Sequence, residues 1–154
     1  MSETEQSLGV VYVVDDDEAV RDSLQWLLEG VNYSVQAYDS AEAFLAAFDP
    51  QALACLILDV RMPGMSGLQL QEELAQRKAE LPIVFLTGHG DVPMAVSTMK
   101  KGAADFSEKP FDQAELKALV EKMLAQARES AAQRERARMN QALLGKLTAR
   151  EQQV

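Results

Sequence analysis

Five short β-rich runs alternate along this chain with segments whose apolar residues recur at helical spacing. Strands that are apolar on both sides, each followed by an amphipathic helix, are typical of a parallel sheet covered by helices on both faces. The runs that we expect to be strands are 10–14, 33–37, 55–58, 82–86 and 104–107. The pattern therefore predicts an α/β protein with a doubly wound, five-stranded parallel sheet.

Residues that begin or end helices fit this alternation. Gly30 is expected to stop the first helix, and Ser40 to cap the second. The last helix starts with Asp112 and Glu115 at the spacing of a capping box. The expected helices begin near Glu18, Ser40, Leu68, Asp91 and Asp112.

Charged and hydroxyl side chains follow four of the expected strands. They are Asp15, Asp16 and Asp17 after the first strand, Asp59 after the third, Thr87 after the fourth and Lys109 after the fifth. The carboxyl ends of parallel strands share one edge of the sheet, where ligands bind in open α/β folds. If the first and third strands are neighbours, carboxylates about 4 Å apart repel by roughly 4 kcal/mol at an effective dielectric constant of 20. A bound cation or raised pKa values would relieve this repulsion.

Composition narrows the class of protein. Cys55 is the single cysteine, so no intramolecular disulfide is available and a reducing cytoplasm fits. No run approaches the ~20 apolar residues of a membrane span, and residues 1–9 are polar and acidic, unlike a signal peptide. Neither a glycine-rich dinucleotide fingerprint nor a Walker lysine motif is present, which disfavours nucleotide binding. We expect a soluble, cytoplasmic protein.

The net charge of −9 is unevenly distributed. Residues 1–112 carry 19 acidic and 7 basic side chains, whereas residues 113–154 carry 5 acidic and 8 basic ones. The acidic part should not favour nucleic acid. In the basic part, the alternation Arg134-Glu135-Arg136 is more typical of a solvated helix face than of a nucleic-acid-binding tail.

Four separated motifs resemble the receiver domain of two-component response regulators. They are 14–18 (VDDDE), 58–67 (LDVRMPGMSG), 86–88 (LTG) and 108–111 (EKPF). The resemblance covers about residues 10–126 and implies the (βα)5 flavodoxin-like topology of that family. The stretch 87–96 is similar to the FixJ-type branch, whose members usually carry a C-terminal LuxR-type helix-turn-helix.

The resemblance also implies a division of the chain. We expect residues 1–8 to be disordered, residues 9–127 to form the receiver domain, and residues 128–146 to be a helical linker with few apolar side chains. Residues 147–154 look like the first part of a LuxR-type DNA-binding domain, with Thr148 to Glu151 in the form of a capping box that starts a new helix. No recognition helix follows, so we expect this chain not to bind DNA specifically.

By family similarity, Asp59 is the phosphoacceptor that attacks a phosphohistidine on a sensor histidine kinase. The implied cofactor is Mg²⁺, which prefers hard oxygen ligands. Asp16 and Asp59 would bind it directly, the backbone carbonyl of Arg61 would supply a third oxygen, and Asp15 would act through water.

The resemblance assigns the remaining strand-end residues to the phosphoryl group and to switching. The Lys109 ammonium and the Thr87 hydroxyl would contact phosphoryl oxygens, and a cis bond is typical between Lys109 and Pro110. Phe106 would change its packing as Thr87 moves, and would carry the signal to the face formed by residues 91–101, 104–107 and 112–126. Receiver domains often dimerise there on phosphorylation. DNA would be contacted only through the absent C-terminal domain.

Simpler interpretations exist for each residue. Asp15 and Asp16 fit an N-cap of the first helix, although Asp17 or Glu18 fills that position equally well. Thr87 could be an ordinary turn residue and Lys109 an ordinary surface lysine. Phe106 could simply fill space in the hydrophobic core. His89, the only histidine, fits a polar loop residue better than a phosphohistidine relay.

Two other functions remain open on the sequence. A degenerate receiver would act only as a protein-interaction module, and the complete set of strand-end residues argues against it. A haloacid-dehalogenase-type phosphatase also combines an aspartate nucleophile with Mg²⁺ on a parallel sheet. That family has Asp-x-Asp-x-Thr/Val after its first strand, whereas here Asp15 and Asp17 are followed by Ala19.

Overall fold

The structure is a computed structural model that describes residues 9–31, 33–50, 52–88, 92–103 and 105–153. The expected disorder of residues 1–8 and the interpretation of His89 as a loop residue fall outside the described residues.

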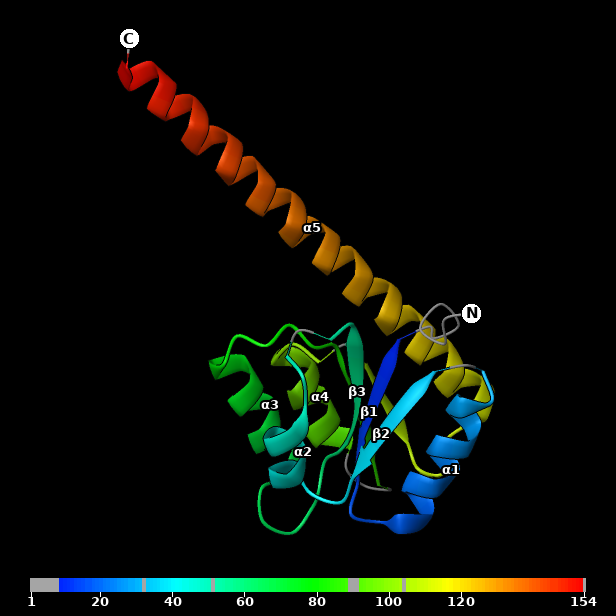
Figure 1. The fold of residues 1–154 in the computed structure, drawn as a ribbon. Coiled ribbons are helices and arrows are strands. Elements are labelled where there is room, and N and C mark those ends of the chain that lie inside the picture. The colour runs from blue at the N-terminus through cyan, green and yellow to red at the C-terminus, as the bar shows by residue number, and fades with distance from the viewer. Residues whose placement is uncertain (1–8, 32, 51, 89–91, 104, 154) are drawn as a thin grey trace.

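Five parallel strands form one sheet in the order β2-β1-β3-β4-β5, which confirms the predicted doubly wound fold (Figure 1). The strands are β1 Val10–Val14, β2 Ser34–Tyr38, β3 Ala54–Asp59, β4 Ile83–Thr87 and β5 Asp105–Glu108. β1 and β3 are neighbours, with Val14 paired to Leu58. Asp15 therefore follows β1 beside Asp59, the last residue of β3.

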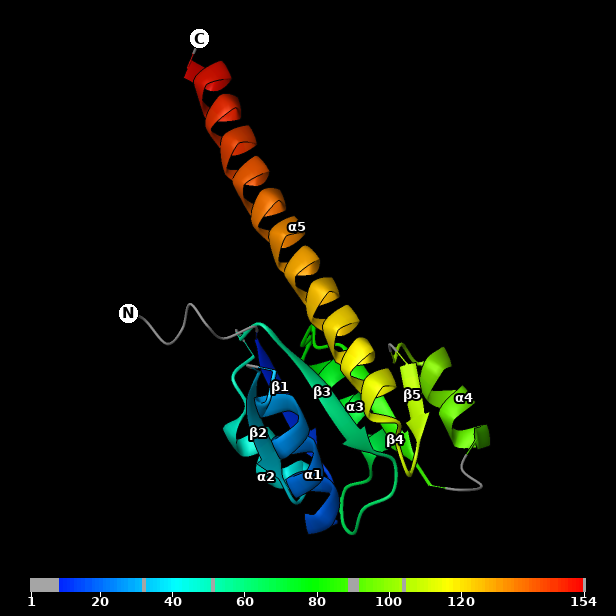
Figure 2. The same cartoon turned by 90° about the vertical axis from the view of Figure 1, so that its right-hand side faces the viewer.

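Helices cover both faces of the sheet. They are α1 Glu18–Glu29, α2 Ala41–Ala47, α3 Gly67–Gln76, α4 Val92–Lys100 and α5 Gln113–Gln153. α1 and the first part of α5 lie on one face, and α2, α3 and α4 lie on the other (Figures 1 and 2). Each connection returns the chain to the same end of the next strand, so all five carboxyl ends meet at one edge.

Alternate residues of the central strands supply two separate cores. Val11, Val13, Cys55 and Ile57 face α1 and α5, and Tyr12, Val14, Leu56 and Leu58 face α2 and α3. Side chains alternate across a strand, so a strand buried on both faces must be apolar throughout. This is why the strands read as continuous apolar runs in the sequence. Cys55 is fully buried, as its place in such a run suggests.

The expected helix caps are present. Asp17 caps α1 by accepting the Ala19 N–H at 2.9 Å, and Gly30 ends that helix. Ser40 caps α2 by accepting the Ala43 N–H at 3.1 Å. Asp112 accepts the Ala114 N–H at 2.9 Å, at the start of α5. These contacts fix where each helix begins behind its strand.

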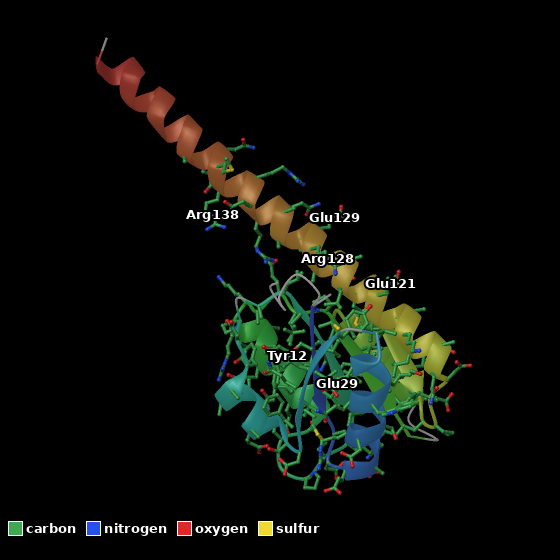
Figure 3. All side chains as sticks on the ribbon, turned by 45° about the vertical axis from the view of Figure 1, so that its right-hand side comes forward. Tyr12, Glu29, Glu121, Arg128, Glu129 and Arg138 are labelled. Carbon is green, nitrogen blue, oxygen red and sulfur yellow. The ribbon has the colours of Figure 1, made fainter. Side chains whose placement is uncertain are left out.

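α5 is a single helix of 41 residues. Its first part packs on the sheet, and from Arg128 onward it leaves the body at the edge opposite the carboxyl ends of the strands (Figures 1 and 3). An ion pair between Arg134 and Glu80, in the loop before β4, ties this extension to the body. The helix start expected at Thr148 is wrong, because α5 continues through that residue to Gln153.

The long α5 is too polar to be a membrane span, and no other helix among the described residues is long and apolar enough to cross a bilayer.

Candidate functional site

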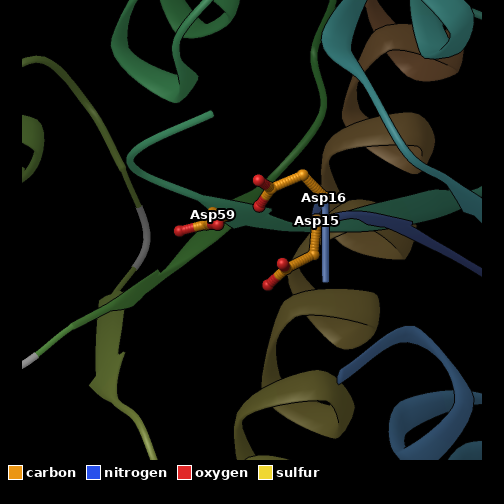
Figure 4. A group of neighbouring side chains, drawn as sticks. All are labelled: Asp15, Asp16 and Asp59. Carbon is orange, nitrogen blue, oxygen red and sulfur yellow. The ribbon is translucent and has the colours of Figure 1, made fainter. Parts of the chain in front are cut away.

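Three carboxylates meet beyond the ends of β1 and β3 (Figure 4). One carboxylate oxygen from each of Asp15, Asp16 and Asp59 lies within 4.8 Å of the other two. Asp15 is fully buried, Asp59 is 6 % exposed and Asp16 is exposed to solvent. The crowding that the sequence predicts is therefore present, with one of the three carboxylates open to solvent.

Asp59 lies in a mixed electrostatic environment. Burial and the nearby charge of Asp15 raise its pKa from 3.8 to about 6, although Lys109 and the Arg61 N–H act in the opposite direction. The Arg61 N–H lies 3.4 Å from Asp59 Oδ1, a long contact. Desolvation and a like charge thus outweigh a cation and a backbone donor, because the cation is shared with a second carboxylate.

Asp15 is held from several sides. Its Oδ1 accepts the Asp17 N–H at 2.9 Å, and its Oδ2 lies 3.0 Å from Lys109 Nζ. Apart from this ion pair, Oδ2 receives no hydrogen bond from the described residues. Arg21, from the second turn of α1, donates to the backbone carbonyl of Asp15 at 2.7 Å. The acidic end of β1 is thereby fastened to α1.

Lys109 supplies the cation of the site. Its Nζ lies 3.4 Å from Asp59 Oδ2 in addition to the contact with Asp15. Burial alone would lower the pKa of Lys109, but the two carboxylates outweigh burial and raise that pKa above its usual value. The Lys109–Pro110 bond is cis, as the resemblance implies, and the Lys109 N–H donates to the Thr87 carbonyl at 2.8 Å.

Thr87 and Phe106 lie on adjacent strands next to the carboxylates. Thr87 is fully buried at the end of β4, and its hydroxyl donates to the Ser107 carbonyl at a long 3.4 Å. Phe106, on β5, is paired in register with Phe85 and is half-buried against the core on the α2 and α3 side. Thr87 and Phe106 therefore lie on neighbouring strands, and their roles in switching stay a prediction.

Sequence reasoning missed the supporting role of Gly67. A β-carbon at Gly67, the first residue of α3, would lie 2.2 Å from the Asp59 carbonyl oxygen, far inside van der Waals contact. The Gly67 N–H also donates to the Val60 carbonyl at 3.0 Å. The glycine therefore lets α3 start directly against the end of β3. Only its place at the end of the 58–67 motif marks it in the sequence.

The donor set fits a hard divalent cation. Three carboxylates supply oxygen ligands only, which suits Mg²⁺ or Ca²⁺ rather than metals that prefer nitrogen or sulfur. A single ammonium leaves a local net negative charge, and the raised pKa of Asp59 shows that this charge is incompletely neutralised. The buried Asp15 Oδ2 has the Lys109 ammonium as its partner among the described residues and receives no other hydrogen bond from them, so a nearby cation would stabilise it further.

Comparison with known proteins decides the family. Residues 11–121 match the response regulator receiver domain. The chain belongs to this family. The acidic group Asp15, Asp16 and Asp59 is the arrangement typical of a receiver Mg²⁺ site. A response regulator is a signalling protein and implies a cognate histidine kinase.

Similar receiver proteins include transcriptional regulators. The transcriptional regulatory protein FixJ of Bradyrhizobium diazoefficiens is 43% identical over 146 residues, which are 95% of this chain and 71% of that protein. The response regulator protein TodT of Pseudomonas putida is 43% identical over 149 residues, which are 95% of this chain and 64% of that protein. This chain is thus similar to the receiver part of FixJ-like two-component transcriptional regulators.

A solved structure agrees with the fold beyond the receiver itself. The response regulator StyR superposes with a TM-score of 0.78 at 42% identity, over 94% of this chain and 70% of that one. The matched part of this receiver therefore includes most of α5.

Proposed function

We propose that Asp59 accepts a phosphoryl group from a phosphohistidine of a sensor histidine kinase. The observation that carries this proposal is the position of Asp59, which is 6 % exposed at a strand end, beside two carboxylates and 3.4 Å from the Lys109 ammonium. An Asp59 oxygen attacks phosphorus and the P–N bond breaks. The imidazole keeps the bonding pair and takes up a proton, and an aspartyl phosphate is formed.

The electrostatics suit this transfer. With a pKa of about 6, Asp59 is roughly tenfold more ionised than protonated at pH 7, so it is available as a nucleophile. Lys109 faces Asp59 with a fixed positive charge that would move onto the phosphoryl oxygens after transfer. Thr87, the last residue of β4, would donate its hydroxyl to the same group. Phosphoryl transfer depends mostly on such positioning and charge neutralisation.

Mg²⁺ is the proposed cofactor. Asp16 and Asp59 would hold it directly, together with the backbone carbonyl of Arg61. Asp15 would act through water, because one of its oxygens is already engaged by the Asp17 N–H and the other by Lys109. When bound, the ion neutralises phosphoryl and carboxylate charge at the site.

The proposed output is a population shift toward a dimer. Movement of Thr87 toward the phosphoryl group would draw Phe106 inward and alter the face formed by α4, β5 and α5. Val96 and Met99 on α4 are 47% and 38% exposed, which supports this face as an apolar contact surface for a second copy. DNA would be contacted only through a LuxR-type domain beyond the receiver, in the cytoplasm. Residues 9–127 would be the receiver and residues 128–146 its linker.

Intact-mass measurement with Mg²⁺ and acetyl phosphate tests the proposal. The wild-type chain should gain ~80 Da, the mass of one phosphoryl group. Asp59→Asn should gain nothing, whereas Asp17→Asn, which removes a nearby charge but keeps a side-chain oxygen to cap α1, should still be phosphorylated. Full modification of Asp59→Asn would refute the assignment of the phosphoacceptor.

The same experiment tests the degenerate-receiver alternative. A chain that gains no mass from acetyl phosphate or from a kinase would act only by protein contact. Membership in the receiver family decides against the haloacid-dehalogenase alternative.

A further inference from the structure

A side chain from α2 reaches the loop that follows Asp59. Glu42, in the first turn of α2, accepts the Met65 N–H on its Oε2 at 3.2 Å, across 23 residues of sequence. Gly64 lies beside the same oxygen with a φ of +75°, and a β-carbon there would be 2.9 Å from Glu42 Oε2. The loop between β3 and α3 curves past α2 at the lower edge of the sheet in Figure 1. Glu42 therefore connects α2 to the middle of the loop through a hydrogen bond.

The two ends of this loop are anchored by contacts of their own. At the start, the Arg61 N–H faces Asp59 Oδ1 and Met62 is buried. At the end, Ser66 and Gln69 form a capping box on α3. Pro63 and Gly64, between these anchors, are exposed. The hydrogen bond from Glu42 reaches this middle part from another element, α2.

We propose that Glu42 is a positioning residue for the metal site. It holds the 61–65 loop in the conformation that presents Asp59 and the backbone of Arg61 to the cation. An untethered loop would have to be ordered when the metal binds, and that entropy cost would subtract from the affinity. The inference rests on the proposed Mg²⁺ and phosphoryl chemistry of Asp59, and it adds a residue that contacts neither the metal nor the phosphoryl group.

Another role of Glu42 has to be separated from this one. A carboxylate in the first turn of a helix stabilises that helix through its dipole, whatever else it contacts. The cap of α2 is already supplied by Ser40. Loss of the dipole contribution would lower the stability of α2, whereas loss of the loop contact would lower Mg²⁺ affinity and the phosphorylation rate.

Two substitutions at Glu42 distinguish hydrogen bonding from charge. Glu42→Ala removes the acceptor, and Glu42→Gln removes the charge but keeps an acceptor for the Met65 N–H. Titration calorimetry with Mg²⁺ alone should show roughly 3- to 10-fold weaker binding for Glu42→Ala, as expected for the loss of one exposed hydrogen bond of ordinary strength. Glu42→Gln should stay within about 2-fold of wild type, since most of the contact is retained. Phosphorylation rates with acetyl phosphate should follow the same order.

Glu29→Ala is the matched control, because Glu29 is an exposed carboxylate at the far end of α1. It should leave Mg²⁺ affinity unchanged. Circular dichroism should show all variants folded, since Glu42 is itself exposed. Equal weakening in Glu42→Gln and Glu42→Ala would assign the effect to charge and overturn the proposal, as would unchanged affinity in Glu42→Ala.

A double-mutant cycle gives a second test. Gly64→Ala should displace the Glu42 carboxylate and weaken Mg²⁺ binding. The further loss from Glu42→Ala should be much smaller in the Gly64→Ala protein than in wild type, because the contact is already broken. Additive losses would overturn the proposal. If wild type bound no Mg²⁺, the proposed function and this inference would both fail. If wild type bound Mg²⁺ and was phosphorylated while the Glu42 variants behaved like wild type, only this inference would fail.

Discussion

Lys109 reaches Asp59 across an intervening strand. Lys109 follows β5 and Asp59 ends β3, with β4 between them, yet Lys109 Nζ lies 3.4 Å from Asp59 Oδ2. The same nitrogen lies 3.0 Å from Asp15 Oδ2. One ammonium thus serves two buried carboxylates, so this residue should influence stability and chemistry in different ways.

Lys109→Met should destabilise the metal-free protein by about 1–3 kcal/mol, because two buried carboxylates lose the ammonium that lies between them. Added Mg²⁺ should recover part of the loss, since it supplies positive charge at the same place. Urea unfolding in chelator and in Mg²⁺ measures both effects. Lys101→Met removes an exposed ion pair with Glu72 and should cost less than about 1 kcal/mol in either condition. Equal losses for the two variants in chelator would contradict the prediction.

The raised pKa of Asp59 predicts how stability depends on pH. The folded state holds the Asp59 proton more tightly than the unfolded chain, with a pKa of about 6 against 3.8. The negative charge of Asp59 therefore lowers the free energy of unfolding above pH 6. This destabilisation becomes smaller as the pH falls from 6 to 4, and it is absent near pH 4. In chelator, Asp59→Asn should gain about 1–3 kcal/mol over wild type as pH rises from 4 to 8.

Chemical unfolding of both proteins across this pH range checks the sign. Excess Mg²⁺ at pH 8 should reduce the advantage of Asp59→Asn, because the ion stabilises the wild-type carboxylate. An advantage that is larger at pH 4 than at pH 8 would show that Asp59 is stabilised as an anion in the folded protein.

Gly67→Ala should damage both fold and site. A methyl group 2.2 Å from the Asp59 carbonyl oxygen forces backbone to move, and we expect a loss of roughly 2 kcal/mol or more in stability and slower phosphorylation. Gly30→Ala is the matched control, because its φ is −63° and its new methyl group would meet ordinary contacts at 3.5 Å. Thermal unfolding and the acetyl phosphate assay compare the two. Similar stability of the two variants would contradict the close approach.

Thr87→Ala should still be phosphorylated but should dimerise less in response to phosphorylation. The Asp59 carboxylate remains, so the mass gain should persist, but the hydroxyl that would favour the active arrangement is gone. Light scattering coupled to size exclusion should show a smaller phosphate-dependent increase in association than in wild type. Thr87→Ser keeps the hydroxyl and should restore most of the increase. An unchanged increase in Thr87→Ala would exclude this route.

Strand ends were predictable from the sequence because they follow from local patterns. The central strands are short apolar runs, and the polar residues that end or follow a strand lie at the shared edge of the sheet. Asp15, Asp59, Thr87 and Lys109 could be assigned to one site for this reason, and the structure brings them together. Caps such as Asp17 and Ser40 were equally accessible, since they depend on residues only two or three positions away.

Contacts between distant segments were not predictable. Neither the Glu42–Met65 hydrogen bond nor the Arg134–Glu80 ion pair leaves a periodic pattern, because each joins exposed polar groups from segments far apart in the sequence. The continuity of α5 was missed for a different reason. Thr148 and Glu151 match a capping box, but the same residues are accommodated inside a helix when the preceding turn is already helical.

Because α5 is a single long helix, a small change in its direction at the receiver becomes a large displacement at its far end. In α5, 25 residues follow Arg128 (153 − 128), which is about 38 Å at 1.5 Å per residue. A tilt of about 5° where the helix leaves the sheet would shift its far end by some ~3 Å, from simple geometry of that length. Helical phase matters as well, since one inserted residue would rotate everything beyond it by about 100°. A domain attached to α5 would therefore respond to the tilt of the helix and to its rotation about its own axis. Both are set by how the first part of α5 packs on its face of the sheet.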